Sequence, residues 1–97
     1  LSPPGLGVYS ATKAAVDSLT RTFAMELEPK NIRVNSVNPG LIVTEGTHAA
    51  GMSQSAPPAH LGKLGEPRHV ADAVLFLASD ASAWMNGQTM SLTGAVV

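Results

Sequence analysis

Cysteine is absent from this 97-residue chain, and aromatic residues make up 4% of it. The absence of cysteine excludes a disulfide framework and a thiolate site. It fits the reducing cytoplasm, so we predict a cytoplasmic protein. Charged residues are also few, at 13%, and the formal net charge is −1. Because there is no basic excess, we expect neither nucleic acid nor an anionic membrane surface as a partner.

Long apolar runs are missing as well. None approaches the ~20 residues that cross a bilayer, and the N-terminus shows no signal-peptide pattern. Apolar residues are nevertheless abundant, at 44%, which argues against disorder. The length allows one small domain. The first residue is Leu1 and not Met, so we expect the chain to be part of something longer.

The hydrophobic pattern predicts two helices and two strands. In chain order we expect a helix over residues 8–28, a strand over 32–37, a sharp break at 38–40, a loop over 45–60, a helix over 67–79 and a strand over 88–92 after a turn at 86–87. This helix–strand–helix–strand order is typical of α/β proteins with parallel sheets. Because two strands do not make a stable parallel sheet alone, we expect further strands upstream.

The predicted helix over residues 8–28 has two apolar faces, and Pro29 should end it. The first face, expected on the core, consists of Val8, Ala15, Val16, Leu19, Phe23 and Leu27. The second consists of Ala11, Ala14, Ser18 and Met25. We expect a partner to cover the second face, and the alternative is a face that is merely poor in charge. The segment 70–78 is apolar nearly all round, which predicts burial on most sides.

Tyr9 and Lys13 lie four residues apart at the start of the first predicted helix. Residues at this spacing share one helix face, so the ammonium can lie near the phenol. A nearby cation favours the phenolate form of a phenol, which suits a general acid–base group for carbonyl chemistry. Taken alone, such a pair is more often simply part of a helix face.

The pair does not stand alone. The motifs that accompany it are Val8-Tyr9-Ser10-Ala11-Thr12-Lys13-Ala14-Ala15-Val16, Ile32-Arg33-Val34-Asn35-Ser36-Val37-Asn38-Pro39-Gly40, Leu64-Gly65-Glu66-Pro67, Phe76-Leu77-Ala78-Ser79-Asp80 and Asn86-Gly87-Gln88. In this order they resemble the C-terminal half of a short-chain dehydrogenase/reductase, of the 3-oxoacyl-carrier-protein reductase kind. The resemblance covers nearly the whole chain. It implies an α/β fold in which residues 1–97 are the C-terminal part of one Rossmann-like, doubly wound parallel sheet.

The resemblance also implies a function. The chain would belong to an oxidoreductase that transfers hydride between NADP or NAD and a small-molecule carbonyl or alcohol substrate. Tyr9 would be the proton donor or acceptor, and Lys13 would assist it and bind the nicotinamide ribose. The cofactor-binding positions it implies are Tyr9, Lys13, Pro39, Gly40, Ile42 and Thr44. The family forms dimers and tetramers, so we expect a homo-oligomer.

Three features of the family are missing or altered. Nothing matches its Gly-rich pyrophosphate turn, and its catalytic Ser falls upstream of Leu1, since Ser2 is too close to Tyr9. Its Asp-Gly-Gly appears as Thr93-Gly94-Ala95. These departures leave a second hypothesis, a truncated, non-catalytic association module that pairs through its helices.

The three histidines show no tight metal-ligand spacing. They are His48, His60 and His69. We interpret each as a lone surface residue and predict no metal site.

Overall fold

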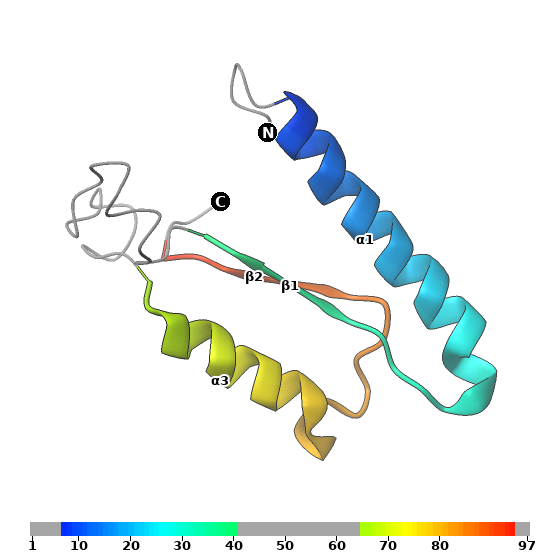
Figure 1. Ribbon diagram of the computed structural model, residues 1–97. Helices are drawn as coiled ribbons and strands as arrows, with labels where there is room; N and C mark the ends of the chain where they lie inside the picture. The colour runs from blue at the N-terminus through cyan, green and yellow to red at the C-terminus, as the bar shows by residue number, and fades with distance from the viewer. Residues whose placement is uncertain (1–6, 41–64, 95–97) are drawn as a thin grey trace, which may run out of the picture. The chain divides into compact units, whose positions relative to one another are not determined.

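The structure is a computed structural model that describes residues 7–40 and 65–94. Its elements, shown in Figure 1, are helix α1 (Gly7–Leu27), 3-10 helix η1 (Glu28–Lys30), strand β1 (Ser36–Pro39), helix α3 (Pro67–Ala78), 3-10 helix η3 (Asp80–Ser82) and strand β2 (Thr89–Leu92). The predicted order of helix, strand, helix and strand is confirmed. The chain forms two compact units, Leu1–Ser36 with Trp84–Met90 and Val37–Ala83 with Ser91–Val97.

Helix α1 has the predicted bounds to within one residue at each end. It contains no Gly or Pro after its first residue, and the hydroxyl of Thr20 donates to the carbonyl of Val16 at 2.8 Å. The α-helix stops at Leu27, because Pro29 shifts the chain into η1. Asn31 then adopts a left-handed conformation with φ of 57° and donates its N–H to the carbonyl of Glu28.

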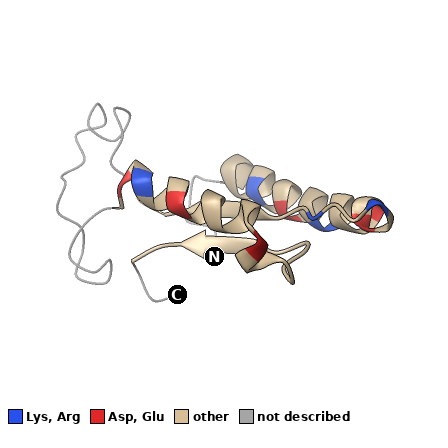
Figure 2. Cartoon of the chain, turned by 90° about the horizontal axis from the view of Figure 1, so that it is seen from below, with Lys and Arg blue, Asp and Glu red and all other residues tan. Residues whose placement is uncertain are grey.

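Charges of both signs are interspersed along α1 and along α3 (Figure 2).

The side of α1 that is covered in the first unit differs from the predicted one. Thr20 and Ala24 are the buried residues of the helix, whereas Val16, Leu19 and Phe23 of the predicted core face are about half exposed. The prediction that this apolar face packs on the core is therefore wrong for the described chain. The reason is the close approach of a backbone turn, which accepts small side chains and excludes large ones.

The residue that makes this approach is Gly87, in the predicted Asn-Gly turn. Its φ is +70°, and a Cβ built there would lie 3.3 Å from the Cβ of Ala24. Glycine is required twice, by the left-handed backbone and by the contact with α1.

We expect Gly87→Ala to lower the free energy of unfolding by about 1–2 kcal/mol, the cost of a left-handed non-glycine residue. Denaturant titration of the purified protein measures the loss. Gly7→Ala is the matched control, since a Cβ at Gly7 meets nothing within 4 Å. Equal stability of the two variants would contradict the packing described for Gly87.

Strand β1 begins later than the predicted strand over residues 32–37. In the preceding segment, Val34 N–H donates to Asn86 Oδ1 at 2.9 Å, while the carbonyl of Val34 accepts the N–H of Gly87 at 2.8 Å. In return, Gln88 N–H donates to Asn35 Oδ1 at 3.1 Å. The two asparagine side chains replace backbone partners, which is why the apolar pattern overestimated the strand at its start.

The strands β1 and β2 form a two-stranded parallel sheet. Ser36 N–H donates to the carbonyl of Gln88, and Gly40 N–H donates to that of Leu92, so both strands advance in the same direction. The predicted break at 38–40 is wrong in part, because Pro39 belongs to β1. Alternate residues of a strand point their N–H groups to the same side, so the nitrogen of Pro39 faces away from β2 and no ladder bond is lost.

Helix α3 begins at Pro67 as predicted, where the missing N–H costs no helix bond. It ends at Ala78, and the Ser79 hydroxyl donates to the carbonyl of Phe76 at 2.7 Å. Burial on most sides is not observed, because only Ala73 is buried and Leu75 is 68% exposed.

Candidate active site

The helix start brings Tyr9 and Lys13 together. Lys13 Nζ lies over the ring of Tyr9, 5.6 Å from its centroid. Tyr9 is 56% exposed and Lys13 is partly buried, so the phenol is open to solvent while its cation is partly sheltered. A cation over a ring face is attracted by about 0.5–1 kcal/mol at exposed sites. The predicted i, i+4 geometry of these two residues is therefore present.

The neighbouring hydroxyl does not compete for this pair. Thr12 Oγ1 donates to the carbonyl of Tyr9 at 2.7 Å, within the helix. The exposed proton-exchanging group and the cation at this site are therefore the phenol of Tyr9 and the ammonium of Lys13. Such a pair can give a proton to a reacting oxygen or take one from it.

Pro39 and Gly40 lie at the carboxyl end of β1, in the second unit. Gly40 N–H donates to the carbonyl oxygen of Leu92 at 2.6 Å. A Cβ at Gly40 would lie 3.0 Å from that oxygen and 3.1 Å from the Cβ of Thr93. Packing against the end of β2 is thus enough to require glycine here. The two other predicted cofactor positions, Ile42 and Thr44, lie outside the described residues.

A chain of side-chain hydrogen bonds that the sequence did not reveal links α1 to the strands. Thr89 Oγ1 donates to Asp17 Oδ1 at 3.0 Å, and Ser36 Oγ lies 2.9 Å from Thr89 Oγ1. The position of Asp17, one turn after Lys13, was a usable signal for its face of the helix. The partners could not be found from sequence, because they depend on the register of the two strands.

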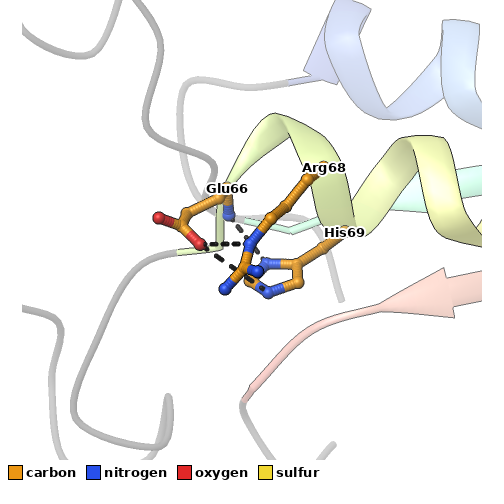
Figure 3. A network of polar contacts seen from close by, with 3 residues as sticks. All are labelled: Glu66, Arg68 and His69. Atoms are coloured by element: carbon orange, nitrogen blue, oxygen red, sulfur yellow. Dashed lines mark hydrogen bonds and ion pairs between the residues drawn. The ribbon is translucent and has the colours of Figure 1, made fainter.

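Three charged or titratable side chains meet at the start of α3 (Figure 3). Arg68 Nε donates to Glu66 Oε2 at 2.8 Å, and His69 Nε2 lies 3.9 Å from the same oxygen. His69 Nδ1 accepts the N–H of Glu66 at 2.9 Å, which makes the two residues a reciprocal capping box. His69 is therefore a surface residue, as predicted, with 40% of its side chain exposed, but it is bonded to Glu66 and does not stand alone. His48 and His60 lie outside the described residues.

The first unit also has a surface pocket of about 410 Å³ that involves neither Tyr9 nor Lys13. Its lining residues are Ser18, Arg21, Thr22, Ala24, Met25, Glu28, Asn86, Gly87 and Gln88.

Within residues 7–40 and 65–94, no group of three His, Cys, Asp or Glu residues is placed to hold a metal ion. Across the same residues, no helix has both the length and the hydrophobicity to cross a membrane.

The parallel α/β arrangement is that of the Rossmann-type proteins, which the similar solved structures share. The family model described as enoyl-(acyl carrier protein) reductase matches residues 2–94. The chain belongs to the short-chain dehydrogenase/reductase family. The predicted family and α/β fold class are thereby confirmed.

Individual relatives agree with this assignment. A 3-oxoacyl-[acyl-carrier-protein] reductase of Thermotoga maritima is 43% identical over 99 residues, which cover 97% of this chain and 39% of that protein. A solved 7α-hydroxysteroid dehydrogenase, complexed with NADH and 7-oxo glycochenodeoxycholic acid, matches with a TM-score of 0.84 and 32% identity. The match covers 100% of this chain and 40% of that one.

A second solved structure is an NADPH-bound short-chain oxidoreductase of Pseudomonas aeruginosa with an atypical catalytic center, with a TM-score of 0.80 and 33% identity over 91% of this chain and 38% of its own. Structural relatives therefore bind either nicotinamide cofactor. The chain spans about 40% of the length of the curated relatives it matches.

Proposed function

We propose that the protein to which this chain belongs transfers hydride between a nicotinamide cofactor and the carbon of a carbonyl or alcohol substrate. The observation that carries the proposal is the Tyr9–Lys13 pair, with the ammonium 5.6 Å from the ring centroid and the phenol exposed. Support comes from the family, whose matched members are named as reductases and dehydrogenases.

Tyr9 has the role of proton donor and acceptor. In reduction, its hydroxyl gives a proton to the substrate oxygen as the carbonyl becomes an alcohol, and in oxidation the phenolate takes that proton back. The exposure of Tyr9 leaves its hydroxyl accessible to a substrate. When bound, the nicotinamide supplies or accepts the hydride.

Lys13 has two roles. Its ammonium, 5.6 Å from the ring centroid of Tyr9, keeps a positive charge beside the proton-exchanging group. It also carries three N–H donors and no acceptor, which suits the ribose hydroxyls of the cofactor. The donor chemistry of the pair therefore fits a nicotinamide nucleotide.

The family resemblance adds cofactor positions at the end of β1 and after it. Ligands of open α/β sheets bind beyond the carboxyl ends of the strands, where Pro39 and Gly40 lie. The backbone of Gly40 is the group offered to the cofactor, because its side-chain position faces the end of β2. Ile42 and Thr44 extend this proposal by family resemblance.

Residues 1–97 would be the C-terminal part of a single Rossmann-type domain in the proposed enzyme. NADP and NAD remain equal candidates, and the substrate is a small carbonyl or alcohol compound. A homo-oligomer, dimer or tetramer, is supported by the exposed apolar side chains of α1, such as Leu19 and Met25. A cytoplasmic location stays a prediction. No observation favours the non-catalytic association module.

The test of the cofactor site is Lys13→Met, which keeps a long side chain and removes the charge. A charge-assisted hydrogen bond contributes about 1.5–3 kcal/mol, so we expect the affinity for NADPH or NADH to fall about 10- to 100-fold. Fluorescence of the reduced cofactor, titrated into purified protein, measures the affinity. An unchanged cofactor affinity would contradict the proposed contact between Lys13 and the ribose.

Lys30→Met is the matched control. Lys30 is the exposed last residue of η1, beyond the far end of α1 from the Tyr–Lys pair, so its loss should leave the affinity within about twofold of the original. A similar loss in both variants would indicate a general effect of net charge and not a contact made by Lys13.

A further inference from the structure

The hydrogen-bonded link from α1 to the two strands has a fixed direction. The single hydroxyl hydrogen of Thr89 goes to Asp17 Oδ1, so Ser36 must be the donor in its 2.9 Å bond to Thr89 Oγ1. Ser36 and Thr89 are the first residues of β1 and β2, and Asp17 lies in the middle of α1. All three residues belong to the first unit, and the link between them is made by side chains.

This link is the polar attachment of the helix to the strands. Within the part of the chain that the structure describes, Asp17 makes the one side-chain hydrogen bond from α1 to a strand residue, whereas Thr12 and Thr20 bond to carbonyls of their own helix. The buried apolar contact of α1 is small, because Ala24 is its buried apolar residue. Small side chains permit rotation about the helix axis more readily than interlocked large ones. The link therefore limits that rotation.

The proposed active-site residues lie on the same side of the helix as the link. Tyr9, Lys13 and Asp17 follow one another at intervals of one turn, with about 6 Å of helix rise between neighbours. A helix with side chains has a radius of about 5–6 Å, so a rotation of about 10° moves a side-chain tip by roughly 1 Å. A displacement of about 1 Å can cost an enzyme as much as ~10²-fold in rate.

We propose that Asp17, held by Thr89 and Ser36, is a positioning residue that fixes the rotation of α1 at which Tyr9 meets the substrate oxygen. This role rests on the function proposed above. Asp17 touches neither substrate nor cofactor, and it acts by keeping the Tyr–Lys pair in place.

The test compares variants that break the link with variants that keep it. Thr89→Val removes the donor without altering charge, and Asp17→Ala removes the acceptor. We expect each to lower kcat about tenfold, with a smaller change in KM, in reduction of a 3-oxoacyl thioester by NADPH or NADH. Thr89→Ser and Asp17→Asn keep a hydroxyl donor and a side-chain oxygen acceptor, so they should keep kcat within about threefold.

The conservative variants separate positioning from charge and from folding. If the charge of Asp17 acted directly on Lys13, Asp17→Asn would lower kcat as much as Asp17→Ala does. Thr89→Val would then leave kcat unchanged. That pair of results would overturn the proposal. The double variant Asp17→Ala/Thr89→Val should lower kcat no further than either single variant does, because the two substitutions break the same link. Additive losses would also overturn it. Glu26→Ala, on the same helix, is the control and should leave kcat unchanged.

The proposed function and the positioning role fail in different ways. If Tyr9→Phe abolishes turnover while Thr89→Val does not alter kcat, only the positioning role fails. If the unmodified protein shows no turnover, or if Tyr9→Phe changes nothing, the proposed function fails and the positioning role fails with it.

Discussion

Replacing Tyr9 with Phe is expected to lower turnover by about 10²- to 10⁴-fold, the range associated with losing a general acid–base group. The substitution removes one oxygen and keeps the ring. Because Lys13 Nζ lies over the ring face, its 5.6 Å contact survives in the variant. A loss of turnover therefore reports the missing proton exchange and not a rearranged lysine.

The measurement is kcat for reduction of a 3-oxoacyl thioester by NADPH or NADH, together with the cofactor affinity from fluorescence. The affinity should stay within about twofold, since the ammonium proposed to bind the ribose is untouched. Trp84→Phe is the control, because Trp84 is a fully exposed aromatic residue in the turn before β2. Retention of full turnover by Tyr9→Phe would contradict the proton-transfer role.

Replacing Gly40 with Ala is expected to destabilise the protein by about 1–3 kcal/mol, the usual cost of adding a methyl group to a filled site. The added Cβ would lie 3.0 Å from the carbonyl oxygen of Leu92 and 3.1 Å from the Cβ of Thr93. The carbonyl oxygen of Leu92 belongs to the backbone, and it already accepts the N–H of Gly40 at 2.6 Å. The end of β1 must therefore move away from the end of β2.

Thermal unfolding followed by circular dichroism measures this effect. A loss of 1 kcal/mol lowers Tm by about 4–8 °C in a protein of 60–100 residues and by about 2–4 °C in one of 150–250 residues. The result also separates two reasons for a glycine at this position. An unchanged Tm with weakened cofactor binding would mean that the cofactor and not the contact with β2 requires glycine at position 40.

Helix bounds were the part of the fold that local chemistry decides, and the sequence predicted them well. Pro67 fixes the start of α3, and Pro29 fixes the end of α1, because each acts on its own backbone and its immediate neighbours. The contact between Tyr9 and Lys13 is also decided locally, since one turn of helix is enough to bring the two side chains together.

Strand bounds and burial were predicted less well, because both depend on residues far away in the chain. The start of β1 is set by Asn86, whose side chain takes the N–H of Val34 and so replaces a strand partner. Periodicity predicted two apolar faces on α1 and placed the larger one on the core, but the buried residues are Thr20 and Ala24. The covered side was decided by Gly87, whose backbone can approach only a small residue such as Ala24.

The sequence by itself determined the family, the order of helices and strands, and the identity and spacing of the Tyr9–Lys13 pair, because each follows from local backbone preference or from motifs in a fixed order. Only the tertiary structure decided that Asp17 reaches Thr89 and that Gly40 meets the end of β2. The physical reason is register. Two parallel strands can slide past each other without changing the local preferences of their residues, and hydrogen bonds between distant side chains exist in one alignment only.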